Sequence, residues 1–291
     1  MIPRYRILFR QQKKQNKMFY IVQENTFRER HYEDLLNALK RYDLEHIIVR
    51  SFPYVDRVVE VSRIPGGPYE VTDLPEISVP KDRKVFVFGS VKLARVCVEK
   101  NLQPGSLLNE QHDFLHYRDH YKDNLLNYDS EIHRLGDDIK WDGYMFLRPT
   151  GDNKAFTGAE FTQVEFEDKR EYILHNFRSK TLNEDTLIQV SKPKYIRKEI
   201  RFWVVGGKVV TGSQYRLGNS VILDENVEQE AWDFAQKMVD IHQIASSFVI
   251  DVCLSDDGWK IVECGCINSA GFYKSDLSKL IQRLEEYYDH Q

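Results

Sequence analysis

A regular pattern of apolar and polar positions begins near residue 18 of the chain. Short apolar runs predict three strands, at residues 19–23, 46–52 and 85–89. Helices are expected between and after them, at residues 28–42 and 90–100, and the stretch 62–83, which is rich in Pro and Gly, is expected to be a loop. Strands that alternate with helices are typical of a small α/β domain.

Further along, the pattern changes to longer strands joined by tight turns. Apolar or alternating runs predict strands at residues 144–148, 185–191, 199–205, 208–216, 248–252 and 261–263. Gly206-Gly207 and the Asp256-Asp257-Gly258 segment separate pairs of these strands, so each pair is expected to form a hairpin. Three helices are expected in this half, at residues 166–179, 226–243 and 275–288.

The second hairpin carries the acidic residues on which the chemistry is expected to depend. Asp251 lies near the end of an apolar, β-branched run, and Glu263 lies in the following strand. Pairing of these strands brings the two carboxylates to facing positions, where they repel each other unless a cation lies between them. Hard oxygen ligands of this kind suit Mg²⁺ that is shared with nucleotide phosphates.

A turn-rich loop at residues 149–158 carries candidate phosphate ligands. Arg148 ends the preceding strand and Lys154 follows six residues later. An arginine fork and a lysine point charge can neutralise different phosphates of one triphosphate. The loop lacks the GxxxxGK[ST] pattern of a Walker loop, and a hairpin with two exposed cations is the simpler alternative.

The following strands add candidate nucleotide contacts. The buried strand 185–191 ends in polar groups, so the edge at Gln189, Val190 and Ser191 can offer backbone N–H and C=O groups to a purine. Arg201 lies two residues after Glu199, on the same strand face, and either contacts the nucleotide or forms a salt bridge with Glu199. Arg216 lies at the far end of the partner strand.

Three other motifs have weaker support. Residues 140–143 read KWDG, which matches the start of nucleotidyl-transfer ligases and would make Lys140 a nucleophile, but the later lysine pair is too close in sequence. Three histidines at a spacing of four residues, His112, His116 and His120, would form one row on a helix, as a packed face, a substrate contact or a metal site. Cysteines flank Gly265, but no second pair has zinc-finger spacing.

Composition restricts the class of protein and its partners. The 291 residues are 42% hydrophobic and 30% charged, and the formal net charge is −4, which is typical of a water-soluble globular protein without a basic coat. No apolar run reaches the roughly 20 residues that cross a bilayer, and four cysteines suit a reduced compartment. A cytoplasmic protein without membrane contact is therefore expected. Residues 1–17 contain six cations and no acid, and form either a flexible tail or an arm that contacts RNA.

The order of these parts resembles that of the ATP-grasp superfamily. Within it, the chain resembles a small phage and bacterial clade with the motifs FxRPxxxxKxFTG, ExRFWVVxGKVVxGSxY and NxSGFY. The corresponding segments here are FLRPTGDNKAFTG, EIRFWVVGGKVVTGSQY and ECGCINSAGFY, and the similarity extends over residues 84–273. The implied fold is an α+β ATP-grasp fold, in which two α+β subdomains clasp ATP, preceded by a small α/β domain.

The resemblance implies roles for specific residues. ATP and Mg²⁺, as two ions, are the expected cofactors. Phosphates are assigned to Arg148, Lys154, Arg201 and Arg216, and adenine to the edge at 189–191. Catalysis is assigned to Arg201, Lys154 and Glu263, and metal binding to Asp251, Glu263 and Asn268. Many members place Asn two residues after the metal-binding Glu, where this chain has Gly265, and Asn268 is expected to substitute for it.

The resemblance also implies a reaction and a division into domains. The expected reaction is phosphorylation of an acceptor carboxylate by ATP and its joining to an amine or another nucleophile. The acceptor is expected to be a small molecule or a peptide. The alternatives are an RNA end-sealing ligase, which would use the basic tail and residues 112–122, and a module that binds ATP without turnover. Expected boundaries are a tail 1–17, a substrate-side domain 18–130, and an ATP-grasp domain 131–291 with subdomains 131–191 and 192–291.

Overall fold

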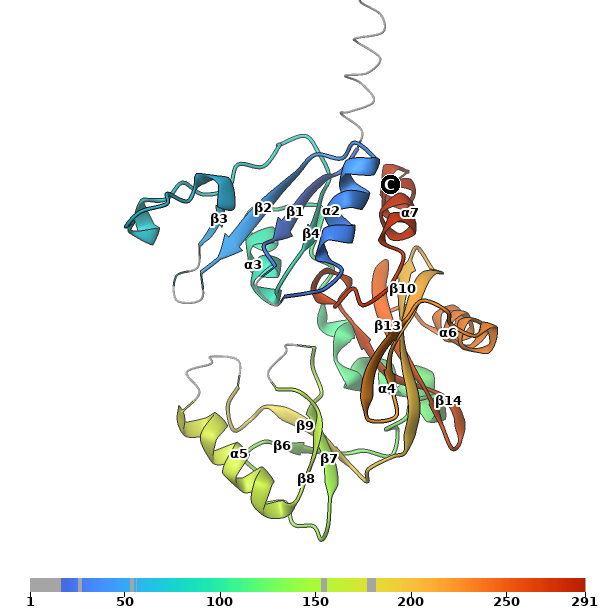
Figure 1. The fold of residues 1–291 in the computed structure, drawn as a ribbon. Coiled ribbons are helices and arrows are strands. Elements are labelled where there is room, and N and C mark those ends of the chain that lie inside the picture. The colour runs from blue at the N-terminus through green and yellow to red at the C-terminus, as the bar shows by residue number, and fades with distance from the viewer. Residues whose placement is uncertain are drawn as a thin grey trace, which may run out of the picture.

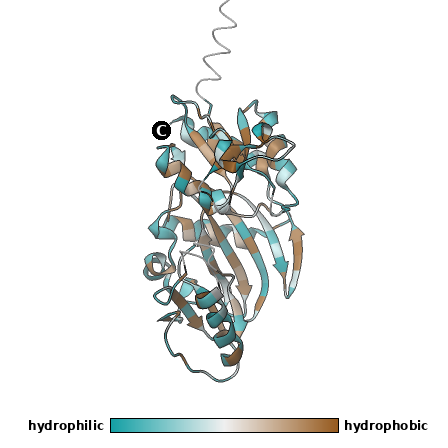
Figure 2. Ribbon diagram, turned by 90° about the vertical axis from the view of Figure 1, so that its left-hand side faces the viewer, coloured by the Kyte–Doolittle hydropathy of each residue, from teal (hydrophilic) through white to brown (hydrophobic). Residues whose placement is uncertain are grey.

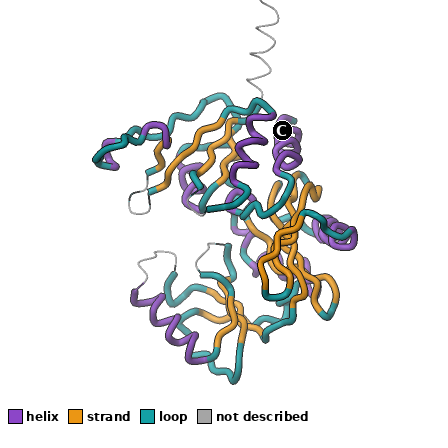
Figure 3. The backbone as a smooth tube through the Cα atoms, viewed as in Figure 1, coloured by secondary structure: helices purple, strands orange, loops and turns teal. Residues whose placement is uncertain are grey.

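The computed structural model describes residues 17–25, 28–52, 55, 57–152, 156–176 and 182–290. Three β-sheets organise these residues, and helices cover their faces (Figure 1). Figure 3 shows the strands gathered in three separate groups, with helices at the periphery of each. We name them the N-terminal, small and C-terminal sheets, in the order in which the chain enters them.

The N-terminal sheet has five strands around a parallel centre. Its spatial order is β3 (Val58–Glu60), β2 (His46–Ser51), β1 (Phe19–Gln23), β4 (Val85–Phe88) and β5 (Pro104–Gly105). Strands β2 and β4 both run parallel to β1, whereas β3 is antiparallel to β2. The connecting segments hold helix α2 (Tyr32–Arg41), the short 3₁₀ helices η1 (Val61–Arg63) and η2 (Val71–Asp73), and helix α3 (Val91–Glu99).

The small sheet has four antiparallel strands and one long helix. Its spatial order is β6 (Glu131–Arg134), β9 (Leu187–Ser191), β7 (Met145–Pro149) and β8 (Ala159–Phe161). Helix α5 (Gln163–Asn176) follows β8 and packs through Phe166 and Ile173. These side chains join a core that contains no residue of the other two sheets among the described residues.

The C-terminal sheet is an antiparallel meander with one crossover. Its spatial order is β12 (Ser220–Asp224), β11 (Lys208–Leu217), β10 (Ile196–Val205), β13 (Ser247–Ser255) and β14 (Gly258–Gly265). Both residues of the Gly206-Gly207 turn have positive φ, 58° and 73°, which a two-residue hairpin of this hand requires. A Cβ atom on Gly206 would also lie only 2.4 Å from the ring of Tyr287, so a larger residue does not fit.

Helices cover both faces of the C-terminal sheet. One face packs against α4 (Phe114–Tyr121) and α6 (Gln229–Ile241). The other face shares a core with β1, β4, α2 and the last helix, α7 (Leu277–Asp289), through side chains such as Trp203, Phe86 and Leu284. Figure 2 shows that hydrophobic residues dominate the central strands, whereas helices and loops mix both classes. The N-terminal and C-terminal sheets are therefore joined by burial of apolar surface, and the small sheet has a core of its own.

Most elements lie where the pattern predicts them, with ends that differ by a few residues. The unpredicted elements are short: strands β3, β5, β6 and β12, and the 3₁₀ helices η1, η2, η3 (Glu110–His112), η4 (Lys122–Asn124) and η5 (Ile267–Ser269). Two to five residues carry too little periodicity to be recognised, and only pairing with a neighbour makes them strands. The domain boundaries inferred from the sequence remain a prediction.

Candidate functional site

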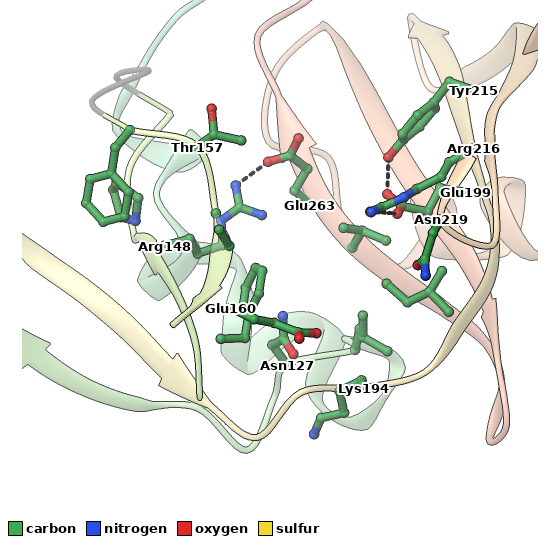
Figure 4. A pocket seen from close by; sticks show the side chains of 18 of the residues that line it. Asn127, Arg148, Thr157, Glu160, Lys194, Glu199, Tyr215, Arg216, Asn219 and Glu263 are labelled. Carbon is green, nitrogen blue, oxygen red and sulfur yellow. Dashed lines mark hydrogen bonds and ion pairs between the residues drawn. The ribbon is translucent and has the colours of Figure 1, made fainter. Parts of the chain in front are cut away.

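A cavity of about 840 Å³ lies between the small sheet and the C-terminal sheet. Strands β7 and β8 form one wall, strands β10, β11 and β14 form another, and the segment 194–196 joins them. We call it the large cavity. Figure 4 shows that charged side chains from both walls are directed into it. Its charged lining residues are Arg148, Asp152, Glu160, Lys194, Glu199, Arg216 and Glu263.

The hairpin of β13 and β14 places the two acidic residues as the sequence predicts. Asp251 and Glu263 are direct cross-strand partners. Directly opposite side chains in an antiparallel pair lie close together on the same face, so the two carboxylates need positive charge near them. A β-bulge follows Asp251, between Asp251 and Val252, and bulges bend a strand next to functional residues.

Arg201 on β10 supplies part of that positive charge. Its Nε donates to Asp251 Oδ1 at 2.8 Å and its Nη2 donates to Asp251 Oδ2 at 2.7 Å, so the pair is bidentate. Nη2 also lies 3.9 Å from Glu263 Oε1. Burial raises the pKa of Asp251, and the Arg201 guanidinium opposes that shift. The cation between the two carboxylates in this structure is thus a guanidinium from the adjacent strand.

Glu199 has a different partner from the one considered in the sequence. Arg201 pairs with Asp251, whereas Glu199 accepts a hydrogen bond of 2.8 Å from Arg216 Nη1 and one of 2.5 Å from the Tyr215 hydroxyl. The predicted Glu199–Arg201 salt bridge is wrong, because cross-strand neighbours approach more closely than residues two apart on one strand. Arg216 is held at the large cavity by this contact (Figure 4).

Arg148 crosses the large cavity. It extends from β7 of the small sheet and its Nη2 pairs with Glu263 Oε2 on β14 of the C-terminal sheet (Figure 4). Burial lowers the pKa of Arg148, but the charges of Glu263 and Tyr117 outweigh it, so the net pKa lies above the ordinary value. The guanidinium therefore stays charged, ready to bind an anion that enters between the sheets.

Two tyrosines hold the Arg201 side chain in place. The rings of Tyr215 and Tyr273 stack at 4.7 Å, and the Arg201 guanidinium carbon lies 4.9 Å from the centre of the Tyr273 ring. Tyr273 has φ of 50°, a left-handed conformation that is uncommon for an aromatic residue and often occurs at functional sites. Cation–π attraction and the Asp251 pair together fix the direction of Arg201.

The arrangement of these parts agrees with a family model. The model describes an ATP-grasp domain, the third family of its clade, and it matches residues 103–284, more than half of the chain. The chain belongs to this ATP-grasp family. The fold expected from the sequence, ATP-grasp with α+β subdomains, is confirmed.

Solved structures share the ATP-grasp fold at low sequence identity. D-alanine–D-alanine ligase from Bacillus anthracis is similar with a TM-score of 0.54 and 11% identity, over 94% of each chain. D-cycloserine synthetase DcsG is similar with a TM-score of 0.56 and 11% identity, over 92% of this chain and 99% of that one. No curated protein sequence matches this chain. At this identity, the structures establish the fold alone.

The residues around the large cavity suit the ATP and Mg²⁺ that ATP-grasp enzymes generally use. Two hard carboxylates, on Asp251 and Glu263, face each other, and the cations Arg148, Lys194 and Arg216 line the cavity that Glu263 also lines. Mg²⁺ prefers oxygen ligands and usually completes its sphere with phosphates and water, so two carboxylates suffice. Within the described residues, no three His, Cys, Asp or Glu side chains are grouped to hold a metal on their own.

The strand assigned to adenine is not an edge. Strand β9 lies between β6 and β7, so the backbone of Gln189 and Val190 is paired on both sides. All three residues 189–191 are buried, and none lines the large cavity. Ser191 donates from its Oγ to Asn127 Oδ1 at 3.3 Å. The expected free edge is therefore corrected to an internal strand, a distinction that depends on the position of β6.

Asn268 is directed away from the two carboxylates. Its Nδ2 donates to Val87 O at 2.7 Å and to Gly105 O at 3.1 Å, and its Oδ1 accepts from Leu107 N at 2.8 Å. It lines a different cavity from the one that Glu263 lines. In this structure Asn268 anchors the N-terminal sheet, and metal binding would require these bonds to break. Lys154 lies outside the described residues.

Several lining residues of the large cavity were missed by the sequence. Lys194, Tyr195 and Ile196 form the segment that links the small sheet to β10, and Lys194 pairs with Asp129 at 2.6 Å. Glu160 on β8 contributes a carboxylate to the opposite wall (Figure 4). Their only signal in the sequence was Pro193, which ends one strand shortly before the next begins.

The weaker motifs receive structural explanations. Lys140 is exposed and pairs with Asp138 at 2.7 Å and Glu167 at 3.2 Å. The three histidines do not share a helix, because His112 ends η3 while the other two lie on α4. All four cysteines are free and buried, and burial raises the pKa of Cys266 to about 11. Among the residues that the structure describes, no helix has the length and apolar character needed to cross a membrane.

Proposed function

We propose that this ATP-grasp chain is an ATP-dependent ligase that phosphorylates an acceptor carboxylate and joins it to an amine. The observation that carries the proposal is the pair of facing carboxylates, Asp251 and Glu263, each held by an arginine beside the large cavity. The structural neighbours described as D-alanine–D-alanine ligase and D-cycloserine synthetase support a ligase or synthetase reaction of this kind.

The reaction proceeds in two steps. A carboxylate oxygen of the acceptor attacks the γ-phosphorus of ATP, the bond from that phosphorus to the bridging oxygen breaks, and ADP leaves. The product is an acyl phosphate. The amine nitrogen then attacks the acyl carbon, the bond from that carbon to the phosphate oxygen breaks, and inorganic phosphate leaves with a proton from the nitrogen or releases it to water. Such transfer depends on positioning and charge neutralisation more than on a protein nucleophile.

Each residue has a defined part in this proposal. Arg148 and Arg216 neutralise phosphates from opposite walls of the large cavity. Arg201, whose direction is fixed by Asp251 and two tyrosines, stabilises the transferring phosphoryl group. Asp251 and Glu263 hold Mg²⁺, which when bound neutralises phosphate charge. Lys154 and a second ion belong to the same proposal.

Residues assigned to RNA contact have structural roles instead. Tyr117 and Tyr121 are buried in the core under the C-terminal sheet. His120 stacks on His242 with ring centres 3.8 Å apart, and Arg118 donates to Tyr128 O at 3.0 Å. We therefore favour a small-molecule or peptide acceptor, and RNA sealing becomes one outcome of the experiment below.

The fate of ATP tests the proposal. The protein is incubated with Mg²⁺ and ATP labelled at the α or γ position, alone, with pooled amino acids and other small acids and amines, and with RNA carrying varied ends. We expect ADP and phosphate only when an acid and an amine are both present. Dependence on RNA would replace the acceptor class. AMP with pyrophosphate, or label retained on the protein, would overturn the ligase mechanism in favour of nucleotidyl transfer.

A further inference from the structure

A second cavity, of about 440 Å³, lies where two parallel strands of the N-terminal sheet end. Residues that follow β1 and β4, such as Glu24 and Gly89, line it. In the sheet, β2 pairs with one side of β1 and β4 with the other, so the chain reverses its direction of winding at this point. Open α/β sheets bind ligands in the crevice at such a switch point. We call it the switch-point cavity.

The walls of the switch-point cavity are mostly apolar. Val22, Phe88 and Val91 come from the N-terminal sheet and α3, and Ala270 and Phe272 come from the segment after β14. Among the described residues, none lines both this cavity and the large cavity. A pocket with apolar walls and a few polar groups is the usual form of a small-molecule site, and here the two halves of the chain build it together.

Three charged side chains line the switch-point cavity, and two of them have partners. Glu24 forms a bidentate pair with Arg50, with 2.8 Å between Oε2 and Nη2. Lys92 donates from its Nζ to Phe52 O at 3.3 Å. The Glu29 carboxylate has no hydrogen bond or ion pair within the described part of the chain. One negative charge is therefore left for a ligand.

The backbone of Glu29 is fixed although its carboxylate is not engaged. Its N–H donates to Asn25 Oδ1 at 2.6 Å, and its C=O accepts from Asn25 Nδ2 at 2.9 Å. Both bonds place Glu29 just before α2, with its side chain at the cavity. A carboxylate carried on a fixed backbone and partly shielded from water binds a cation more strongly than a carboxylate on a free surface.

Gly271 connects this carboxylate to the proposed catalytic arginine. Its C=O accepts from Arg201 Nη1 at 3.4 Å. A Cβ atom on Gly271 would lie 3.4 Å from Glu29 Oε2 and 3.7 Å from Arg201 Nη1. The carboxylate and the guanidinium thus converge on one glycine. An anionic acyl phosphate beside Arg201 and a cationic amine beside Glu29 would meet there.

We propose that the switch-point cavity binds the amine substrate, as a primary ammonium on a compact apolar body. The inference rests on the proposed function for its place in the reaction, but the binding itself follows from the cavity. A carboxylate would be repelled by Glu29, and a strongly polar body would lose its water against apolar walls without compensation. An ammonium gains the Glu29 charge and buries its carbon atoms.

Two probes with similar carbon skeletons and opposite charge test the proposal. Ligand-observed NMR on the full chain, without nucleotide, measures binding of isobutylamine and of isobutyrate. We expect isobutylamine to bind and isobutyrate to bind at least about tenfold more weakly. Glu29→Gln should weaken isobutylamine binding about tenfold, because the charge-assisted bond is lost. Glu33→Gln removes the same charge from an exposed position on α2 outside the cavity and should change nothing.

The outcomes separate this inference from the ligase proposal. Failure of isobutylamine to bind, equal binding of both probes, or unchanged binding by Glu29→Gln would overturn it. Circular dichroism confirms that each variant is folded, and Glu29→Asp, which keeps the charge but shortens the side chain, serves if Glu29→Gln is not folded and should bind with intermediate strength. Binding that depends on Glu29, combined with no ADP formation from any substrate pool, would support the cavity assignment and overturn the ligase proposal.

Discussion

The two cavities of this chain approach each other around Gly271 and Arg201, yet they differ in how their carboxylates are compensated. In the large cavity, Glu199 and Glu263 are each paired with an arginine. In the switch-point cavity, Glu29 has no ion-pair partner among the described residues. The first is prepared to exchange its internal partners for a polyanion and its metal, and the second is prepared to accept a cation.

The difference follows from where the charges originate. The arginines of the large cavity stand on strands that face or adjoin the acidic hairpin, so the folded chain supplies counter-charges by itself. Glu29 lies on a segment before α2 whose neighbours are apolar strand ends. Pairing stabilises an empty polar site, whereas an unpaired carboxylate at an apolar wall keeps binding energy available for a ligand.

Arg201→Met should have the largest effect, because Arg201 contacts a residue of each cavity. It leaves Asp251, which is only 2% exposed, without a counter-charge, and we expect a loss of about 3–5 kcal/mol in the free energy of unfolding. Urea denaturation measures it. Arg197→Met on the same strand removes an exposed pair with Asp256 and should cost below about 1 kcal/mol. Similar losses in both variants would contradict the structural role of the buried pair.

Glu263→Gln should affect the large cavity alone. Turnover should fall at least about a hundredfold, because a metal ligand is removed. The free energy of unfolding should change by less than about 1 kcal/mol, since Glu263 is partly exposed and glutamine fills the same volume. ADP release and a thermal melt measure the two effects. Glu160→Gln, on the opposite wall, is the control and should stay within a few-fold of wild type. Normal turnover in Glu263→Gln would remove Glu263 from the metal site.

Asn268→Ala separates an anchor of the switch-point cavity from a metal ligand. Loss of its amide leaves buried backbone groups of Val87, Gly105 and Leu107 without partners, which should cost about 1–3 kcal/mol of stability. The Mg²⁺ concentration that gives half-maximal turnover should not change. If it rises about tenfold while the unfolding curve is unaltered, Asn268 is a ligand as the sequence resemblance implies.

Lys140→Ala should have the smallest effect, because Lys140 lines neither cavity. The side chain is exposed and makes only surface pairs with Asp138 and Glu167, so activity and stability should match wild type within error. Gel analysis with ATP labelled at the α position provides the measurement. Disappearance of a covalent enzyme–AMP species in this variant would show that the KWDG motif is active and that the comparison of cavities misses the reacting group.

Sequence reasoning succeeded where the chemistry is local to one hairpin. The facing of Asp251 and Glu263 depends only on the turn between two adjacent strands, which the Asp256-Asp257-Gly258 segment indicates. The Gly206-Gly207 hairpin was predicted for the same reason. The motif order was also sufficient for the fold, because it preserves the succession of strands that the ATP-grasp family shares.

The sequence failed where a residue depends on distant partners. The free edge expected at Gln189 and Val190 became an internal strand because four residues of β6, more than fifty positions earlier, pair with it. Asn268 followed the acidic strand in sequence, but its amide was captured by strand ends of the N-terminal sheet. Neither outcome has a signature within the local stretch.

By itself, the sequence determined the hairpins, the helices with strong periodicity and the identity of the acidic pair, because these depend on spacing along the chain. The tertiary structure alone decided which cation neutralises which carboxylate. Arg201 moved from Glu199 to Asp251, and Arg148 reached Glu263 from another sheet. Pairing follows distance in space and exclusion of water, and a linear pattern contains neither. For the same reason, only the fold showed Glu29 beside the glycine that Arg201 contacts.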